Sequence, residues 1–114
     1  VSFRHITESL PAEDVLRILG EALDVETDEF RRRRHNSPLR AAAAHCLIRY
    51  TGQSQRVVAD LLNMGSGSAV CKQIGALPAK CAKDRRLRHQ IMQAEARLAD
   101  LLSAREQRLP NATL

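Results

Sequence analysis

Apolar residues recur along this chain at the spacing of amphipathic helices, with polar residues at the positions between them. The first pattern predicts a helix over about residues 11–24, because steps of three and four residues return to one helix face. Pro11 suits the first turn, where the amide that proline lacks would have no partner. The other face of this helix is acidic, so we expect it to point away from any nucleic acid. The apolar face comprises Val15, Ile18, Leu19, Ala22 and Leu23.

Two more apolar patterns follow before the middle of the chain. Residues 27–30 have the composition of a capped helical turn, with Phe30 as its anchor in the core. A helix from about Pro38 to Thr51 is expected next, and Gly52 supplies its left-handed stop. Its alanines allow neighbouring helices to approach closely, so we expect it to be the central buried helix. Its apolar face comprises Leu39, Ala42, Ala43, Cys46, Leu47 and Tyr50.

The stretch from Thr51 to Leu77 predicts two short helices joined by a tight turn at residues 63–67. The first would begin at Ser54, whose hydroxyl can accept a hydrogen bond from the opening turn. Its apolar stripe comprises Val57, Val58, Leu61 and Leu62. The second would begin near Ser66 or Ser68 and bury Val70, Ile74 and Leu77, leaving Ser66, Ser68, Lys72 and Gln73 on the outer face.

Pro78 predicts a boundary after this second helix, with residues 79–83 as a short connection that is either irregular or itself helical. Asp84 then has the character of a helix cap. The last helix carries a heptad-like apolar face, which we expect to pack back onto the bundle, with homodimerisation through residues 84–108 as the alternative. That face comprises Leu87, Ile91, Ala94, Leu98 and Leu101.

Composition and these patterns together predict an all-α helical bundle. The chain has 114 residues, of which 44% are hydrophobic, and its only aromatic residues are Phe3, Phe30 and Tyr50, so the core must be aliphatic and helical rather than a sheet sandwich. We expect an irregular lead-in over 1–10, one domain over 11–83, the last helix over 84–108 and a flexible tail over 109–114. No apolar run is long enough to span a bilayer and no signal peptide is evident, so we expect a cytoplasmic protein without a membrane partner.

The charge is unevenly distributed along the chain. Residues 1–30 carry two basic residues against eight acidic ones, residues 31–90 carry thirteen against two, and residues 91–114 carry three of each. The basic excess therefore coincides with the two short helices. A surface of this kind suits phosphates, because each neutralised phosphate releases counterions, and it favours double-stranded DNA as the partner.

Several residue types in this basic region have the chemistry of a DNA contact. The run of Arg31, Arg32, Arg33 and Arg34 is expected to form a basic arm that reaches phosphates or a narrow minor groove. Arg40 and Arg49 lie off the apolar stripe of their helix and are expected to reach the DNA backbone. The glycines Gly65 and Gly67 expose backbone amides at a helix start, which can hold a phosphate. Ser66, Ser68, Lys72 and Gln73 are the candidates for base edges.

The sequence carries no pattern of a catalytic or metal site. The three cysteines have no metal-ligand spacing, and Cys46 and Cys71 fall on apolar stripes, so we expect them to be buried hydrophobic residues. The histidines are scattered, and Tyr50 lies at the core-facing end of a helix. We therefore expect no metal, no cofactor and no enzymatic activity in these residues.

The order of helix, arginine loop, central helix and helical pair resembles the C-terminal DNA-binding domain of the bacterial replication initiator DnaA, over roughly residues 11–77. The residues that carry the resemblance are Arg40 with the alanines after it, Thr51, Ser54, Val58, Ala59, Leu62 and Val70. The resemblance implies a helix-turn-helix of the Trp-repressor-like type. It also implies that Arg32, the nearest match by position, enters the minor groove, with Arg34 beside it, and that Ser54, Gln55 and Arg56 contact phosphates.

The chain departs from that family where the family reads bases. The family has Asp-His-Thr-Thr at the head of the second helix, whereas this chain has Ser66-Gly67-Ser68-Ala69. A similar helical domain with an extra helix occurs at the C-terminus of proteins resembling REP-associated tyrosine transposases. We therefore expect the DNA-recognition part of a transposase-like protein, with an initiator-like or regulatory DNA-binding domain second. A helical protein-interaction module is the alternative from another class.

Overall fold

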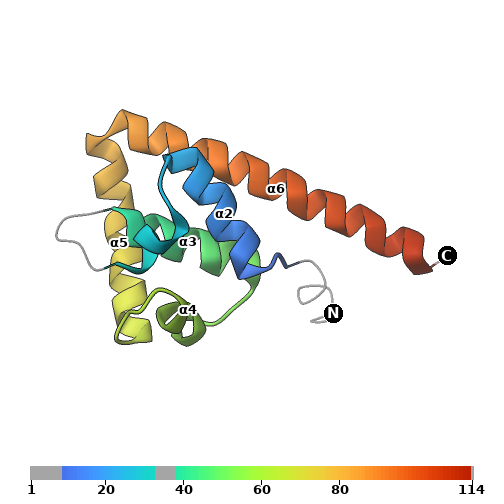
Figure 1. The fold of residues 1–114 in the computed structure, drawn as a ribbon, viewed down its shortest axis with the longest axis horizontal. Helices are drawn as coiled ribbons and strands as arrows, with labels where there is room; N and C mark the ends of the chain where they lie inside the picture. The colour runs from blue at the N-terminus through green and yellow to red at the C-terminus, as the bar shows by residue number, and fades with distance from the viewer. Residues whose placement is uncertain (1–8, 33–37, 114) are drawn as a thin grey trace.

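The computed structural model describes residues 9–32 and 38–113, with side chains up to residue 104. Within these ranges the chain forms helices joined by turns and short connections, without a strand, so the all-α prediction is confirmed (Figure 1). No helix in the described ranges is long and apolar enough to cross a membrane. The elements in chain order are α2 (Ala12–Leu23), the 3-10 helix η1 (Thr27–Arg31), α3 (Leu39–Thr51), α4 (Gln55–Leu61), α5 (Gly67–Lys83) and α6 (Arg85–Thr113).

Helix α3 is the centre of the bundle, as its sequence predicts. It contacts α2, η1, α4, α5 and α6. The four alanines 41–44 are fully buried, and the absence of larger side chains there lets the surrounding helices approach closely. Cys46 and Leu47 are also fully buried. The helix ends at Gly52, whose φ of +70° is the left-handed stop expected from the sequence.

Helix α2 and η1 cover one side of α3. Pro11 is the N-cap of α2, and Val15 and Leu19 are fully buried. The helix ends in a tight turn in which the Val25 amide donates to the Gly20 carbonyl at 2.9 Å. A Cβ at Gly20 would lie 2.9 Å from the Val25 carbonyl oxygen, so only glycine fits this approach. Phe30 in η1 is fully buried, which confirms its predicted place in the core.

Helix α5 does not end at Pro78, so the predicted boundary there is wrong. The helix runs through this proline to Lys83. An internal proline removes one backbone hydrogen bond, but Pro78 is exposed and the continued helix buries Leu77 and half-buries Cys81 against the bundle. Burial of that apolar face offsets the lost hydrogen bond. The next helix starts where the sequence predicts, because the Asp84 carboxylate accepts a hydrogen bond from the Leu87 amide at 3.0 Å.

Helix α6 crosses the bundle along α2 and continues beyond it (Figure 1). The predicted apolar face packs within the same chain: Leu87, Ile91, Ala94 and Leu98 are all buried and Leu101 is half-buried. Arg97 of α6 donates to the Glu21 carboxylate of α2 at 2.8 Å. The backbone of α6 stays helical to Thr113, so residues 109–113 form helix where the sequence predicts a flexible tail.

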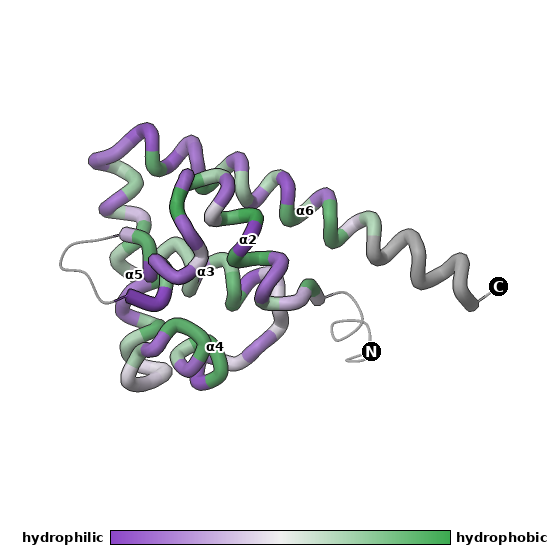
Figure 2. Tube along the Cα trace, in the orientation of Figure 1, coloured by the Kyte–Doolittle hydropathy of each residue, from purple (hydrophilic) through white to green (hydrophobic). Residues whose placement is uncertain are grey.

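Two apolar residues predicted to be buried are exposed. Val57 is 38% exposed, because α4 is only seven residues long and buries Val58 and Ala59 rather than the whole of its apolar stripe. Cys71 is exposed on the flank of α5 and is therefore not a core residue. Figure 2 shows hydrophobic positions recurring along α2 and α6, and hydrophilic positions running together at the corner where α5 meets α6.

Candidate nucleic-acid interface

The starts of α4 and α5 are built by serine caps, as the sequence predicts. The Ser54 hydroxyl accepts a hydrogen bond from the Val57 amide, and the Ser66 hydroxyl accepts one from the Ala69 amide, both at 3.3 Å. Between the helices the chain turns at Asn63, whose φ is +55°, a left-handed conformation that asparagine tolerates. The Met64 amide then donates to the Ala59 carbonyl at 2.8 Å. Caps and turn together fix the angle at which α5 leaves α4.

The two helix starts lie against each other. The Gln55 side chain donates to the Cys71 sulfur at 3.4 Å. A Cβ at Gly67 would lie 3.4 Å from the Gln55 Cβ and 3.7 Å from the Arg56 amide nitrogen, which are van der Waals distances, so the start of α5 is in contact range of the start of α4. The structure thus brings the predicted contacts at 54–56 and 65–68 into one region of the surface, although they lie at the beginnings of different helices.

The outer face of α5 has the composition expected from the sequence. Gly65, Ser66, Ser68 and Lys72 are exposed, and Gln73 is half-buried. Val70 is fully buried and Leu77 is buried, while Ile74 is half-buried on the same inner side. The first turns of α5 therefore present short polar side chains and Lys72 to solvent, while the apolar face of the helix holds it on the bundle.

Two of the candidate arginines hold the turn between α4 and α5. The Arg31 Nε donates to the Leu61 carbonyl at 3.0 Å, and the Arg40 Nη2 donates to the Asn63 carbonyl at 2.9 Å. Both carbonyls lie at the end of α4, where a helix leaves backbone acceptors without partners in its own ladder. The geometry therefore gives Arg31 and Arg40 a structural role that the sequence analysis missed, because each bond joins residues far apart in the chain.

The first arginines of the basic run also pair with acidic residues of η1. Arg31 lies 3.8 Å from the Asp28 carboxylate and Arg32 lies 3.2 Å from that of Glu29. Both arginines are exposed, so each pair contributes little to stability and leaves the arginine able to exchange its partner for a phosphate. Arg33 and Arg34, the other two members of the predicted arm, lie outside the described residues.

Arg49 lies away from the other candidate contacts. Its Nε is 3.9 Å from the Glu95 carboxylate of α6, and its guanidinium carbon is 5.8 Å from the centre of the Tyr50 ring. The same carboxylate is 3.0 Å from His45. The structure therefore places Arg49 between α3 and α6 and not beside α4 and α5. Tyr50 is buried, and this burial raises the pKa of its hydroxyl, in keeping with a packed rather than a reactive tyrosine.

Basic side chains divide into two groups by whether the protein itself neutralises them. Those on α2, η1, α3 and the middle of α6 pair with carboxylates: Arg17, Arg31, Arg32, Arg49 and Arg97. Those from α4 to the first turns of α6 form no ion pair with any carboxylate that the structure describes: Arg56, Lys72, Lys80, Lys83, Arg85, Arg86 and Arg88. Positive charge without an internal partner is therefore concentrated on α4, α5 and the α5–α6 corner.

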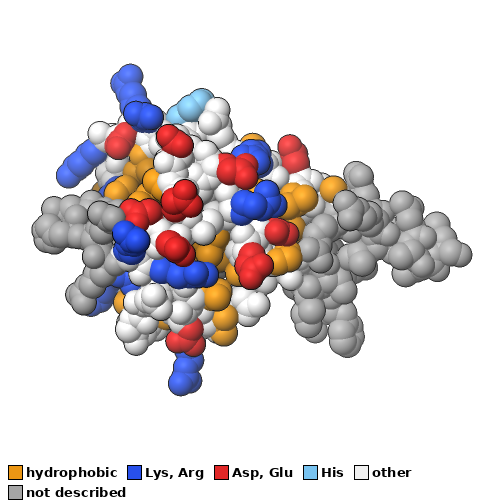
Figure 3. Space-filling model, in the orientation of Figure 1, with side chains coloured by type: hydrophobic (Ala, Val, Ile, Leu, Met, Phe, Trp, Pro, Cys, Tyr) orange, Lys and Arg blue, Asp and Glu red, His pale blue; other side chains and the backbone are white. Residues whose placement is uncertain are grey.

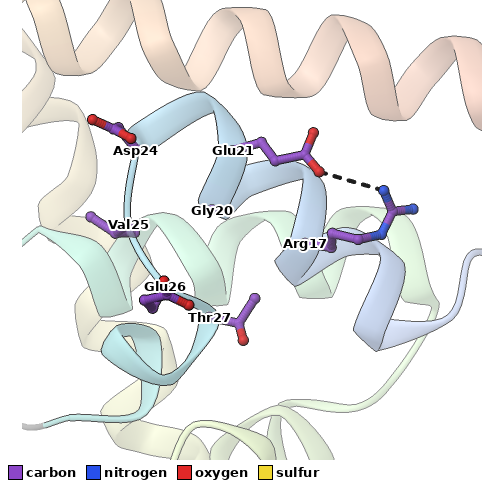
Figure 4. Close-up of a pocket in the computed structure, with 7 residues that line it drawn as sticks. All are labelled: Arg17, Gly20, Glu21, Asp24, Val25, Glu26 and Thr27. Atoms are coloured by element: carbon purple, nitrogen blue, oxygen red, sulfur yellow. Dashed lines mark ion pairs between the residues drawn. The ribbon is translucent and has the colours of Figure 1, made fainter.

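In the view of Figure 3, acidic side chains lie over α2 and η1 with basic ones among them, and basic side chains project at the α5–α6 corner. An open hollow of about 410 Å³ lies on the acidic side, lined by Arg17, Gly20, Glu21, Asp24, Val25, Glu26 and Thr27 (Figure 4). The hydrogen bond from Arg97 holds the pKa of Glu21 below its ordinary value, with a further contribution from Arg17. Its three carboxylates make this hollow unsuitable for a phosphate. No group of three or more potential metal ligands is assembled among the described residues.

Comparison of the chain with protein families, with curated proteins and with solved structures finds no match. The arrangement of α4, α5 and their charges therefore supplies the basis for a functional assignment.

Proposed function

We propose that this chain is a double-stranded DNA-binding module in which α4 and α5 act as a helix-turn-helix of the Trp-repressor-like type. The observation that carries the proposal is the meeting of two capped, exposed helix starts beside Arg56 and Lys72, which have no carboxylate partner among the described residues. Backbone amides at helix starts and cationic side chains both favour phosphate. A helix is about 10–12 Å across and so fits a major groove about 12 Å wide.

In this arrangement the first half of α5 enters the major groove. Ser66, Ser68, Lys72 and Gln73 then face the base edges, where lysine can bond guanine and glutamine can pair with adenine through two bonds. The half-burial of Gln73 places it at the edge of this set rather than at its centre. Ser54, Gln55 and Arg56 at the start of α4 contact phosphates, which fix the orientation of α5 without reading sequence.

Arg31, the first residue of the arginine run, lies beside this surface, because its side chain is bonded to the end of α4. We assign Arg32, whose side chain is exposed, to the adjacent minor groove, where it would exchange its ion pair with Glu29 for DNA. Arg40 is assigned to holding the turn and Arg49 to the α3–α6 contact. The resemblance to the initiator domain and the extra helix α6 support a transposase-like parent first and an initiator-like or regulatory parent second, by analogy of fold.

The alternative class, a protein-interaction or dimerisation module, would use the apolar face of α6. Four of its five residues are buried within one chain, so this face is occupied by the bundle itself. That observation counts against a homodimer through the first part, residues 84–98, of the predicted 84–108 segment.

A duplex-binding assay over a salt series tests the proposal. We expect the wild type to bind, and Arg56→Ala to weaken binding to every duplex while lowering the slope of log K against log salt by about 0.9. Lys72→Ala should relax preference at a particular base pair, worth about 1–3 kcal/mol, in selection from a random duplex library. Arg17→Ala is the matched control, since it removes the same charge from the acidic face. A wild type that binds no duplex at low salt would exclude the proposal.

A further inference from the structure

Continuation of α5 through Pro78 places a second lysine in line with Lys72. Lys83 follows Lys72 by eleven residues, which is close to three full helical turns, so both project from the same side of α5, about 16 Å apart. Both are exposed. Lys80 lies about 80° around the helix from Lys72 and is half-buried. The alignment follows from the unbroken helix and would be lost if the helix ended at Pro78.

The surface of α5 between these two lysines carries only small, uncharged side chains. Gly75, Ala76 and Ala79 are exposed there, and no acidic residue occurs anywhere in α5. Nothing lies within 4 Å of a Cβ built at Gly75, so this face is open to solvent. A flat anionic surface could therefore approach the backbone of α5 closely along the whole distance from Lys72 to Lys83.

Two arginines at the start of α6 follow Lys83 directly after the Asp84 cap. Arg85 and Arg86 are exposed and pair with no described carboxylate, and the one nearby acid, Asp84, accepts the Leu87 amide instead. Cations in the first turn of a helix oppose its dipole, and the single carboxylate at this helix start, the Asp84 cap, stands beside two arginines. Their position is locally unfavourable to the helix, and binding of an anion from outside the protein would remove that cost.

We propose that Lys83, Arg85 and Arg86 form a basic track that continues from Lys72 and binds the phosphate backbone of the same duplex beyond the major groove entered by the start of α5. The inference rests on the proposed function. The distance from Lys72 to Lys83 exceeds the width of the groove, about 12 Å, and spans roughly five base-pair steps of about 3.4 Å. Lys83 and the two arginines therefore contact phosphates flanking the site that α5 reads, independently of sequence.

Binding to two duplex lengths tests the track. A duplex of about 12 base pairs, roughly one helical turn, is long enough for the major groove that α5 enters. A duplex of about 24 base pairs, roughly two turns, also offers the flanking phosphates. We expect Lys83→Ala and the double variant Arg85→Ala/Arg86→Ala to weaken binding to the long duplex and to lower its salt slope by about 0.9 for each charge removed. Their binding to the short duplex should change much less.

Lys80→Ala is the matched control, because it removes the same charge from the same helix one turn earlier but from its flank. We expect it to leave the long-duplex slope unchanged. Thermal unfolding of each variant should show an unchanged or slightly higher midpoint, since Arg85 and Arg86 oppose the helix dipole.

The possible failures are distinguishable. If the wild type binds no duplex, the proposed function itself fails. If it binds but Lys83→Ala and Arg85→Ala/Arg86→Ala keep the wild-type affinity and salt slope on the long duplex, the track is wrong and the groove contact stands. If Lys80→Ala and Lys83→Ala lose equal affinity for the long duplex, the loss reflects net charge alone and not the position of the lysine, which would also overturn the track. If the wild type binds anionic phospholipid vesicles, and Lys83→Ala and Arg85→Ala/Arg86→Ala lose that binding while their duplex binding is unchanged, the α5–α6 corner would be assigned to a membrane surface instead.

Discussion

Replacing Arg40 with alanine separates a role in folding from a role in DNA binding. The guanidinium donates to the Asn63 carbonyl at 2.9 Å, across the turn that sets the direction of α5. A hydrogen bond from a charged donor contributes about 1.5–3 kcal/mol when well buried, and this one is partly exposed, so we expect a loss of about 1 kcal/mol. For a chain of this size that corresponds to a fall in the unfolding midpoint of about 4 °C.

Thermal unfolding followed by circular dichroism measures this loss, and duplex titration over a salt series measures DNA contacts in the same samples. A structural Arg40 lowers the midpoint and leaves the salt slope as in the wild type, whereas a phosphate contact lowers the slope by about 0.9 and leaves the midpoint unchanged. Arg56→Ala should give the second signature and serves as the comparison. An Arg40→Ala protein with the wild-type midpoint would refute the assignment.

Three further predictions concern the stability and chemistry of the bundle. Gly20→Ala should lower the unfolding free energy by about 1–3 kcal/mol in denaturant titration, because the new Cβ meets a backbone oxygen at 2.9 Å; an unchanged midpoint would contradict this contact. Burial raises the pKa of Cys46 to about 12, so a thiol reagent at pH 8 should modify exposed Cys71 rapidly and Cys46 only on unfolding. Mass spectrometry of cleaved peptides measures the order of modification, and modification of Cys46 before Cys71 would contradict this prediction. The pKa of Glu21 lies below its ordinary 4.5 in the folded state, so the pair with Arg97 stabilises the protein above that pH and ceases to do so as the pH falls through the lowered value. The difference in unfolding midpoint between wild type and Arg97→Ala should therefore shrink from pH 7 to pH 3, and a constant difference would count against the pair.

Local signals in the sequence predict most of the helix boundaries. Ser54, Ser66 and Asp84 accept hydrogen bonds from amides three residues later, and Gly52 adopts the left-handed stop, because these features depend only on neighbouring residues. Pro78 was misleading for the opposite reason. Its local penalty is outweighed by tertiary burial of the apolar residues on both sides of it, which a local rule does not include.

The site was less predictable than the fold. Helical periodicity correctly identifies Ser68 and Lys72 as outward-facing, but it does not say which outward residues of different helices share one surface. Arg40 and Arg49 are both off the apolar stripe of α3, yet one is bonded to the turn before α5 and the other pairs with α6. Their partners lie far away in the chain, so only the folded arrangement distinguishes them.

The central claim, that the adjoining starts of α4 and α5 meet duplex DNA, is tested most directly by mapping backbone amide shifts in NMR spectra while a duplex is titrated into the protein. We predict that the largest changes fall on residues 54–56 and 65–73, and that α2 on the acidic side is unaffected. Changes confined to α2 and the middle of α6, or none at low salt, would contradict the account.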